Sequence, residues 1–149
     1  RKIKLKDFYK GYKQIDKATD EILEKIIFTA PQTNNFNFEK VSKRTHLDIA
    51  SVNSACSLIQ TEDGVIQEIH ISAGGVFAFP KYLQNTSDFL VGKKINAENL
   101  KTAVEIMNAE IAPISDARGT AGYKRLLLRQ LFLAHFIKET GPVKKLIGL

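Results

Sequence analysis

The chain has 149 residues, of which 44% are hydrophobic and 26% charged, a balance that fits one globular domain with a core of its own. Its formal charge is +6. No apolar run approaches the roughly 18 residues that span a bilayer, and the start has no signal-peptide pattern. We therefore expect a cytoplasmic protein without a membrane partner. The single cysteine, Cys56, excludes an intrachain disulfide and a thiolate metal cluster built from this chain alone.

The first thirty residues predict short extended pieces. Residues 8–13 are strand-like, and Gly11 indicates a bulge or bend within them. The apolar run over residues 22–29 fits a helix face as well as a strand. Because the run is short and Pro31 follows soon after it, a strand is favoured.

The middle of the chain predicts an antiparallel sheet, with strands over residues 36–42, 49–60 and 65–73. The dipeptide Asp63-Gly64 between the last two is the usual signal of a tight hairpin, because both residues tolerate positive φ. Alternation predicts which side chains share a face. On the first strand these are Phe36, Phe38 and Lys40, and on the third they are Val65, Gln67, Ile69 and Ile71.

After Gly74-Gly75, which predicts a turn that needs positive φ, the pattern becomes helical. Three helices are expected, over residues 88–91, over 97–111 and from 121 to about 138. Their expected N-caps are Thr86 or Ser87, then Asn96, then Thr120, and Gly92 is expected to end the first. Strands followed by helices predict an α+β fold, an antiparallel sheet of three to four strands backed on one face by about three helices.

No self-contained catalytic motif is present. His46, His70 and His135 lie far apart without the spacing of metal ligands, and His135 is predicted to be a packed or surface residue. Asp116 and Arg118 precede the last helix and are predicted to be structural, with Arg118 paired to Asp116 or to the sheet. The residues alone therefore support an α+β domain and leave its function open.

Five phrases in chain order, however, resemble the C-terminal domain of the FAD-binding subunits of molybdenum hydroxylases, of the xanthine dehydrogenase small-subunit type. The most informative phrase runs from Phe38 through Lys40 and a Ser/Arg-rich turn to Asp48-Ile49-Ala50. The others are Phe8-Tyr9-Lys10-Gly11-Tyr12-Lys13, the strand that opens with Glu21-Ile22-Leu23, the turn Gly74-Gly75-Val76 with Pro80-Lys81, and the stretch from Pro113-Ile114-Ser115-Asp116 to Tyr123-Lys124-Arg125.

The resemblance implies a part of a larger oxidoreductase. Electrons would leave a purine or related heterocycle at a molybdenum cofactor and pass through 2Fe–2S clusters to FAD and then to NAD. Residues 1–149 would form a single C-terminal domain, and an upstream FAD-binding domain, with or without a 2Fe–2S domain, would be absent from this chain. The implied partners are those domains and a molybdopterin-binding large subunit. We expect the isolated domain to fold without turnover.

The same resemblance implies the contacts with the cofactor. Lys40 matches a FAD-contacting lysine, Leu23 an apolar FAD contact, and Arg44 an arginine on the loop near the flavin, while no catalytic residue and no metal ligand is expected in this chain. Thr45-His46-Leu47 replaces an acidic stretch of the family's mammalian members. The preference for NAD over oxygen is therefore not carried over. Phe79 replaces a residue that is often small, which leaves the shape of that turn open.

Two alternatives remain. One is a binding or interaction module that reuses the fold without flavin and without enzymatic activity. The other is a basic nucleic-acid-binding domain, which the charge would suit but which is disfavoured, because the basic residues are spread along the chain without an aromatic-basic motif. A salt-dependent shift on mixed DNA would favour the latter.

Overall fold

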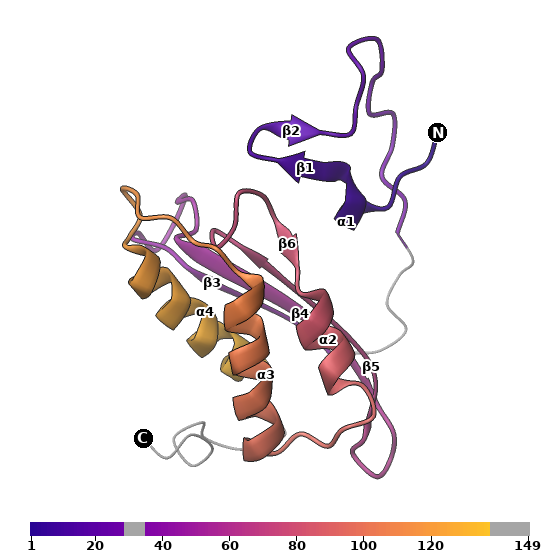
Figure 1. Cartoon of the computed structure of the whole chain (residues 1–149), viewed down its shortest axis with the longest axis vertical. Coiled ribbons are helices and arrows are strands. Elements are labelled where there is room, and N and C mark those ends of the chain that lie inside the picture. The colour runs from indigo at the N-terminus through magenta and orange to yellow at the C-terminus, as the bar shows by residue number, and fades with distance from the viewer. Residues whose placement is uncertain (29–34, 138–149) are drawn as a thin grey trace.

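A computed structural model describes residues 1–28 and 35–137 of the chain. Its centre is an antiparallel sheet in the order β3-β4-β5-β6. Three helices, α2, α3 and α4, pack on one face of this sheet (Figure 1), which confirms the predicted α+β fold. The strands are Phe36–Val41, Val52–Gln60, Ile66–Gly74 and Lys81–Tyr82, and the helices are Gln84–Leu90, Ala97–Glu110 and Ala121–Ala134.

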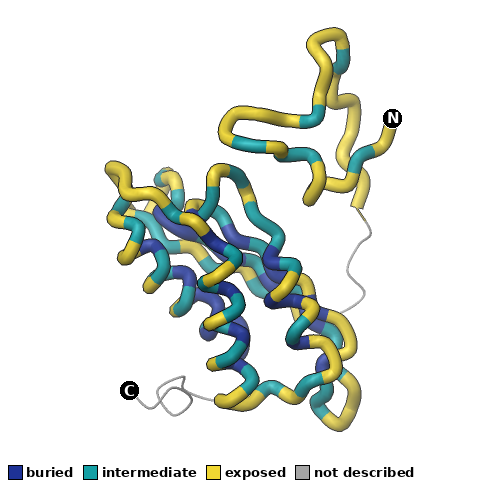
Figure 2. The backbone as a smooth tube through the Cα atoms, in the orientation of Figure 1, coloured by how far each residue is buried: buried dark blue, intermediate teal, exposed yellow. Residues whose placement is uncertain are grey.

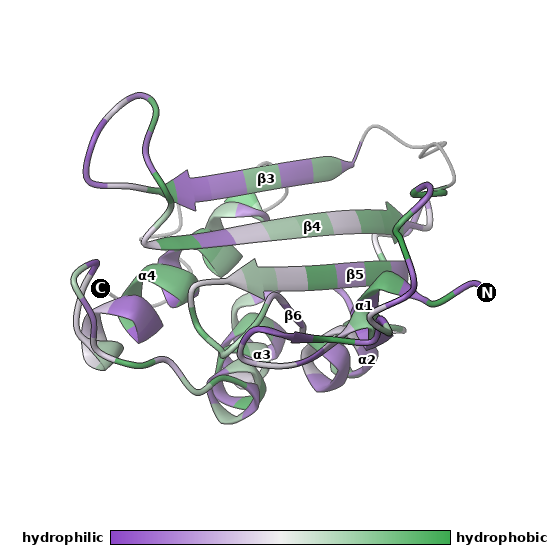
Figure 3. Cartoon of the chain, turned by 90° about the horizontal axis from the view of Figure 1, so that it is seen from above, coloured by the Kyte–Doolittle hydropathy of each residue, from purple (hydrophilic) through white to green (hydrophobic). Residues whose placement is uncertain are grey.

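The core lies between the helices and the sheet. Every second residue of β4 is buried, as expected for a sheet that is covered on one side. The strands β3, β4 and β5 run side by side (Figure 3). No helix of the described residues covers their other face, which we call the open face. The largest fully buried side chains are those of Phe132, Phe136, Ile66, Ile71, Leu83, Leu90, Leu100, Met107, Leu128, Leu133, Val52 and Val76.

Residues 1–28, which we call the N-terminal arm, lie apart from this core. The arm contains α1 (Leu5–Phe8) and the hairpin of β1 (Tyr9–Gly11) and β2 (Gln14–Ile15). Figure 2 shows most of it exposed. The register of the hairpin shifts between Tyr9 and Gly11, as the predicted bulge requires. The strand is shorter than predicted, because Phe8 ends a helix and the backbone of Lys13 lies in the left-handed region.

The strand predicted over residues 22–29 is not formed. Residues 22–28 have no regular secondary structure, and Thr29 lies outside the described residues. A strand needs a neighbour for its backbone hydrogen bonds, and residues 22–28 have no such partner within the described part of the chain.

The central hairpin differs in detail from its prediction. β4 begins at Val52 rather than at residue 49, because residues 42–51 form a loop. A bulge between Ile59 and Gln60 shifts the phase of β5, so that Ile66 is buried while Gln67 and its neighbour are exposed. The prediction that Val65, Gln67, Ile69 and Ile71 share one face is therefore wrong for Val65 and Gln67. It is confirmed for Ile69 and Ile71.

The helix caps confirm two predictions and correct a third. Asn96 accepts a hydrogen bond from the backbone N–H of Asn99, and Thr120 accepts one from that of Tyr123. α2, however, begins four residues earlier than predicted. Thr86 and Ser87 lie inside it because their hydroxyls have tertiary partners, a carboxylate oxygen of Glu110 and the backbone N–H of Ile71. Gly92 ends this helix with φ +78°.

Candidate functional site

Three segments that are far apart in the sequence meet at one end of the sheet. They are the loop 42–51 after β3, the Gly74-Gly75 turn after β5, and residues 112–120 before α4 (Figure 1). The Lys43 ammonium donates to the carbonyl of Ala117 at 2.6 Å, and the Ser51 hydroxyl donates to the carbonyl of Arg118 at 3.2 Å. The segments that carry three of the five family-like phrases thus form one surface, which we call the loop end.

Lys40 and Arg44 both lie at this loop end and are organised by Asp48. The Lys40 ammonium donates to the backbone carbonyl of Asp48 at 2.9 Å. The Asp48 carboxylate accepts the backbone N–H of Arg44 at 2.9 Å and lies 3.5 Å from the Arg44 guanidinium. That backbone hydrogen bond, with the nearby guanidinium charge, lowers the pKa of Asp48.

Both cations nevertheless face solvent. Lys40 is exposed on β3, and 73% of the Arg44 side chain is exposed, whereas Asp48 is mostly covered. The loop that holds them is coloured predominantly hydrophilic in Figure 3. Asp48 thus holds Lys40 through its backbone carbonyl and Arg44 through its carboxylate, and it leaves both positive charges accessible. Such an arrangement suits the binding of an anionic or electron-rich group.

Leu23, the third predicted contact, lies in the N-terminal arm and is 63% exposed. The Lys6 ammonium of the arm donates to the Gln84 side chain at 3.1 Å and lies over the Tyr82 ring. These contacts place the arm beside β6 and α2, whereas Lys40 and Arg44 lie at the loop end. The structure therefore brings two of the three predicted residues together and leaves Leu23 on a separate element.

The turn before α4 is held by a buried lysine that sequence reasoning missed. The Lys124 ammonium lies 2.7 Å from the Asp116 carboxylate and donates to the carbonyl of Ile114 at 2.9 Å. Arg118 contributes its backbone N–H to Asp116 at 2.8 Å, so the ion pair predicted for Arg118 belongs to Lys124 instead. The hydrogen bond from Lys124, then that from Arg118, lowers the pKa of Asp116.

Replacing Lys124 with methionine is expected to lower the free energy of unfolding by about 2 kcal/mol. Breaking a buried ion pair costs roughly 3–5 kcal/mol, and the smaller figure follows because the Asp116 side chain stays 33% exposed. Urea unfolding measures the change, with the exposed Lys101→Met on α3 as the control. Equal stability of the two variants would contradict the structural role of Lys124.

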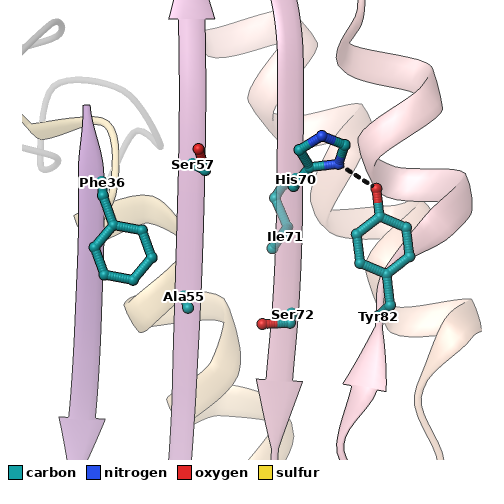
Figure 4. Close-up of a pocket in the computed structure, with 7 residues that line it drawn as sticks. All are labelled: Phe36, Ala55, Ser57, His70, Ile71, Ser72 and Tyr82. Atoms are coloured by element: carbon teal, nitrogen blue, oxygen red, sulfur yellow. Dashed lines mark hydrogen bonds between the residues drawn. The ribbon is translucent and has the colours of Figure 1, made fainter. Parts of the chain in front are cut away.

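The open face carries a shallow pocket of about 150 Å³. The rings of Phe36 and Tyr82 stand on either side of it (Figure 4). Between them β4 and β5 contribute the lining residues Ala55, Ser57, His70, Ile71 and Ser72. The His70 ring lies 2.7 Å from the Tyr82 hydroxyl and 2.8 Å from the Glu68 carboxylate. The pKa of the Tyr82 hydroxyl is raised, and burial is the largest cause. The predicted alternation of β3 already placed Phe36 on the same face as Lys40.

The three histidines lie on separate elements, His46 in the loop 42–51, His70 on β5 and His135 after α4. Among residues 1–28 and 35–137, no group of three or more His, Cys, Asp or Glu side chains could hold a metal ion. Of the two places predicted for His135, packed or at the surface, the structure shows the packed one, with 8% exposure. Within the same ranges, no helix has the length and apolar character to cross a membrane.

Comparison with known proteins places these features in a family. The family model of the CO dehydrogenase flavoprotein C-terminal domain matches residues 38–140. A xanthine dehydrogenase of Oryza sativa subsp. japonica is 31% identical over 147 residues, which cover 94% of this chain and 11% of that protein. The glyceraldehyde dehydrogenase medium chain of Sulfolobus acidocaldarius is 28% identical over 137 residues, covering 91% of this chain and 48% of that one.

Solved structures agree with these sequence matches. A Cu,Mo-CO dehydrogenase superposes with a TM-score of 0.78 at 26% identity, over 85% of this chain and 44% of that chain. Quinoline 2-oxidoreductase from Pseudomonas putida 86 superposes with a TM-score of 0.75 at 26% identity, over 89% of this chain and 46% of that chain. The chain thus spans about a tenth of the xanthine dehydrogenase and about half of the shorter relatives. Because the family model matches most of the chain and the fold agrees, the chain belongs to the CO dehydrogenase flavoprotein C-terminal domain family.

Proposed function

We propose that this domain completes the FAD site of a xanthine dehydrogenase-like flavoprotein. In the complete enzyme, electrons from a purine or related heterocycle would reach FAD through a molybdenum cofactor and 2Fe–2S clusters, and NAD would accept them. The partners would be an upstream FAD-binding domain and a molybdopterin-binding large subunit, in the cytoplasm. The observation that carries the proposal is the exposed Lys40 ammonium at the loop end, in a chain of this family.

The surface around Lys40 fits one side of a flavin. Lys40 pairs with Asn53 of β4, and Phe38 pairs with Ala55, whose other neighbour is Ser72 of β5. A floor of small residues lets a planar ring approach the sheet, and the exposed Phe38 ring supplies apolar contact. When bound, FAD supplies the chemistry that accepts and releases electrons.

The protein's own contribution is electrostatic. A reduced flavin is negatively charged near its N1 edge, so a fixed cation there favours reduction. Because the Asp48 carbonyl holds the Lys40 ammonium at 2.9 Å, little ordering is needed when the cofactor binds. Arg44, held by the carboxylate of the same residue, would add positive charge at the loop, and Leu23 would exclude water from the ring.

Substituting Lys40 with alanine in the complete native flavoprotein is expected to weaken FAD binding about tenfold, the loss of one charge-assisted hydrogen bond. The flavin should also reduce at a lower potential. FAD dissociation and the visible spectrum under reductive titration measure both effects. Lys101→Ala, on the helix-covered side, is the matched control. If the FAD affinity and the flavin reduction potential of the Lys40 variant are unchanged, Lys40 does not contact the flavin.

A further inference from the structure

A second cavity lies between the N-terminal arm and the edge of the sheet. Its volume is about 340 Å³, more than twice that of the pocket on the open face. The arm contributes residues of α1 and β1 to one wall, and the other wall consists of residues of β6, of the turn before it and of the start of α2. A cavity of this size can hold a small organic molecule. We call it the arm cavity.

Positive charge prevails around the arm cavity. Three lysines line it, Lys6 and Lys10 from the arm and Lys81 from β6, against the single carboxylate of Asp7. The Lys10 ammonium lies 3.3 Å from the carboxylate of Asp16, but this pair is exposed, and an exposed ion pair contributes little to stability. Lys10 can therefore turn to another anion at little cost.

The other two lysines have neutral partners. The Lys6 ammonium donates to the Gln84 side chain at 3.1 Å and lies 5.5 Å from the centre of the Tyr82 ring. The Lys81 ammonium lies 4.8 Å from the centre of the Phe77 ring. Within residues 1–28 and 35–137, neither lysine forms an ion pair with a carboxylate. A cavity lined by uncompensated charges of one sign attracts ions of the other sign.

Three further lining residues are aromatic. Tyr9 belongs to the arm, and Phe79 and Tyr82 belong to the wall on the side of the sheet. A ligand ring that packs against such side chains gains about 0.5–1.5 kcal/mol beyond the burial of its area. Rings and uncompensated ammonium groups around one cavity therefore favour a ligand that joins an aromatic ring to a negative charge.

We propose that the arm cavity binds a small aromatic anion, a ring that carries a carboxylate or a phosphate group. The anionic group lies between Lys6 of the arm and Lys81 of β6, and the ring packs against Phe79. Because these lysines stand on opposite walls, the bound anion also fastens the arm to the edge of the sheet. No lining residue belongs to the loop 42–51, to the Gly74-Gly75 turn or to residues 112–120. The site is thus distinct from the loop end and goes beyond the proposed function.

Isothermal titration calorimetry on the complete native flavoprotein tests the proposal, with phenyl phosphate and benzoate as probes. At least one of them is expected to bind with a Kd on the order of 0.1 mM. Phenol lacks the charge and inorganic phosphate lacks the ring, so each should bind at least about tenfold more weakly. The tighter of the two probes identifies the anionic group. Binding of both probes no tighter than that of phenol or inorganic phosphate would overturn the proposal.

Substitutions on both walls locate the bound probe. Lys81→Gln and Lys6→Gln are each expected to weaken binding of the tighter probe about tenfold, through loss of one charge-assisted contact. Lys101→Gln, on the exposed side of α3, is the matched control and should leave the affinity unchanged. Lys40→Ala should also leave it unchanged, since Lys40 lies at the loop end. Full affinity in both cavity variants, or a loss in the Lys40 variant, would place the probe elsewhere and refute the arm cavity as its site.

Discussion

Alanine in place of Gly75 is expected to lower the free energy of unfolding by about 3 kcal/mol. Gly75 has φ +83°, and a side-chain carbon there would clash with the backbone carbonyl oxygen of Ser51. The left-handed backbone alone costs a non-glycine residue roughly 1–2 kcal/mol. Because the clashing atom is backbone, relief requires the Gly74-Gly75 turn and the loop 42–51 to move apart, which adds to this cost.

Gly92→Ala separates the two causes. Gly92 has φ +78°, nearly the same conformation, but nothing lies within 4 Å of the added carbon. Urea unfolding of the two variants should therefore give a clearly larger loss for Gly75 than for Gly92. Equal losses would mean that the turn and the loop are not held in close contact, and the loop end would then not be the fixed surface described here.

Acidification from pH 6.5 to pH 4 is expected to destabilise the domain by about 3 kcal/mol through His135. The ring is 8% exposed, with Nδ1 2.6 Å from Oδ1 of Asn37 and Nε2 2.9 Å from the Ser54 hydroxyl. In a neutral ring, Nδ1 donates to Asn37 and Nε2 accepts from the Ser54 hydroxyl, which otherwise donates to the carbonyl of Ser72 at 3.2 Å. Burial lowers the pKa of His135 from 6.5 to about 4.

The sign follows from proton binding. Between pH 6.5 and pH 4 the unfolded chain binds a proton at this histidine and the folded chain does not, so stability falls as the pH falls through this window. Above pH 6.5 the stability from this group is fully present. A shift from 6.5 to about 4 corresponds to about 3 kcal/mol, at 1.36 kcal/mol per pKa unit.

Urea midpoints between pH 4 and pH 8 measure this effect. His135→Asn should flatten the slope, whereas His46→Gln, on the exposed loop, should keep it. The lowered pKa values of Asp48 and Asp116 contribute at more acid pH, because their stabilising effect is lost only below their ordinary value of 3.8. A flat profile for the wild-type domain above pH 4.5 would contradict the buried neutral histidine.

The sequence predicted the elements whose signals are local. Asn96 and Thr120 were identified as helix caps because capping depends on residues three positions apart. The strand β3 followed from alternation alone. The short strand β6 was missed, because two residues carry no periodicity and pair with β5 only in three dimensions.

What was missed depends on tertiary partners. Ser87 looked like a cap, but its hydroxyl oxygen accepts a hydrogen bond from the backbone N–H of Ile71 in β5. The buried role of Lys124 follows from its distance to Asp116, which no spacing rule gives. The candidate site shows the same division. Lys40 and Arg44 were predictable as neighbours on a strand and its loop, whereas their common anchor at Asp48 required the folded loop.

The most direct test of the central claim is the flavin content of the complete native flavoprotein, purified without added cofactor. We predict a yellow protein with a stoichiometric amount of tightly bound FAD, and a visible spectrum that is lost on reduction and regained when NAD accepts the electrons. A colourless protein that takes up no FAD on incubation would contradict the claim. The domain would then be a binding module that uses this fold without flavin.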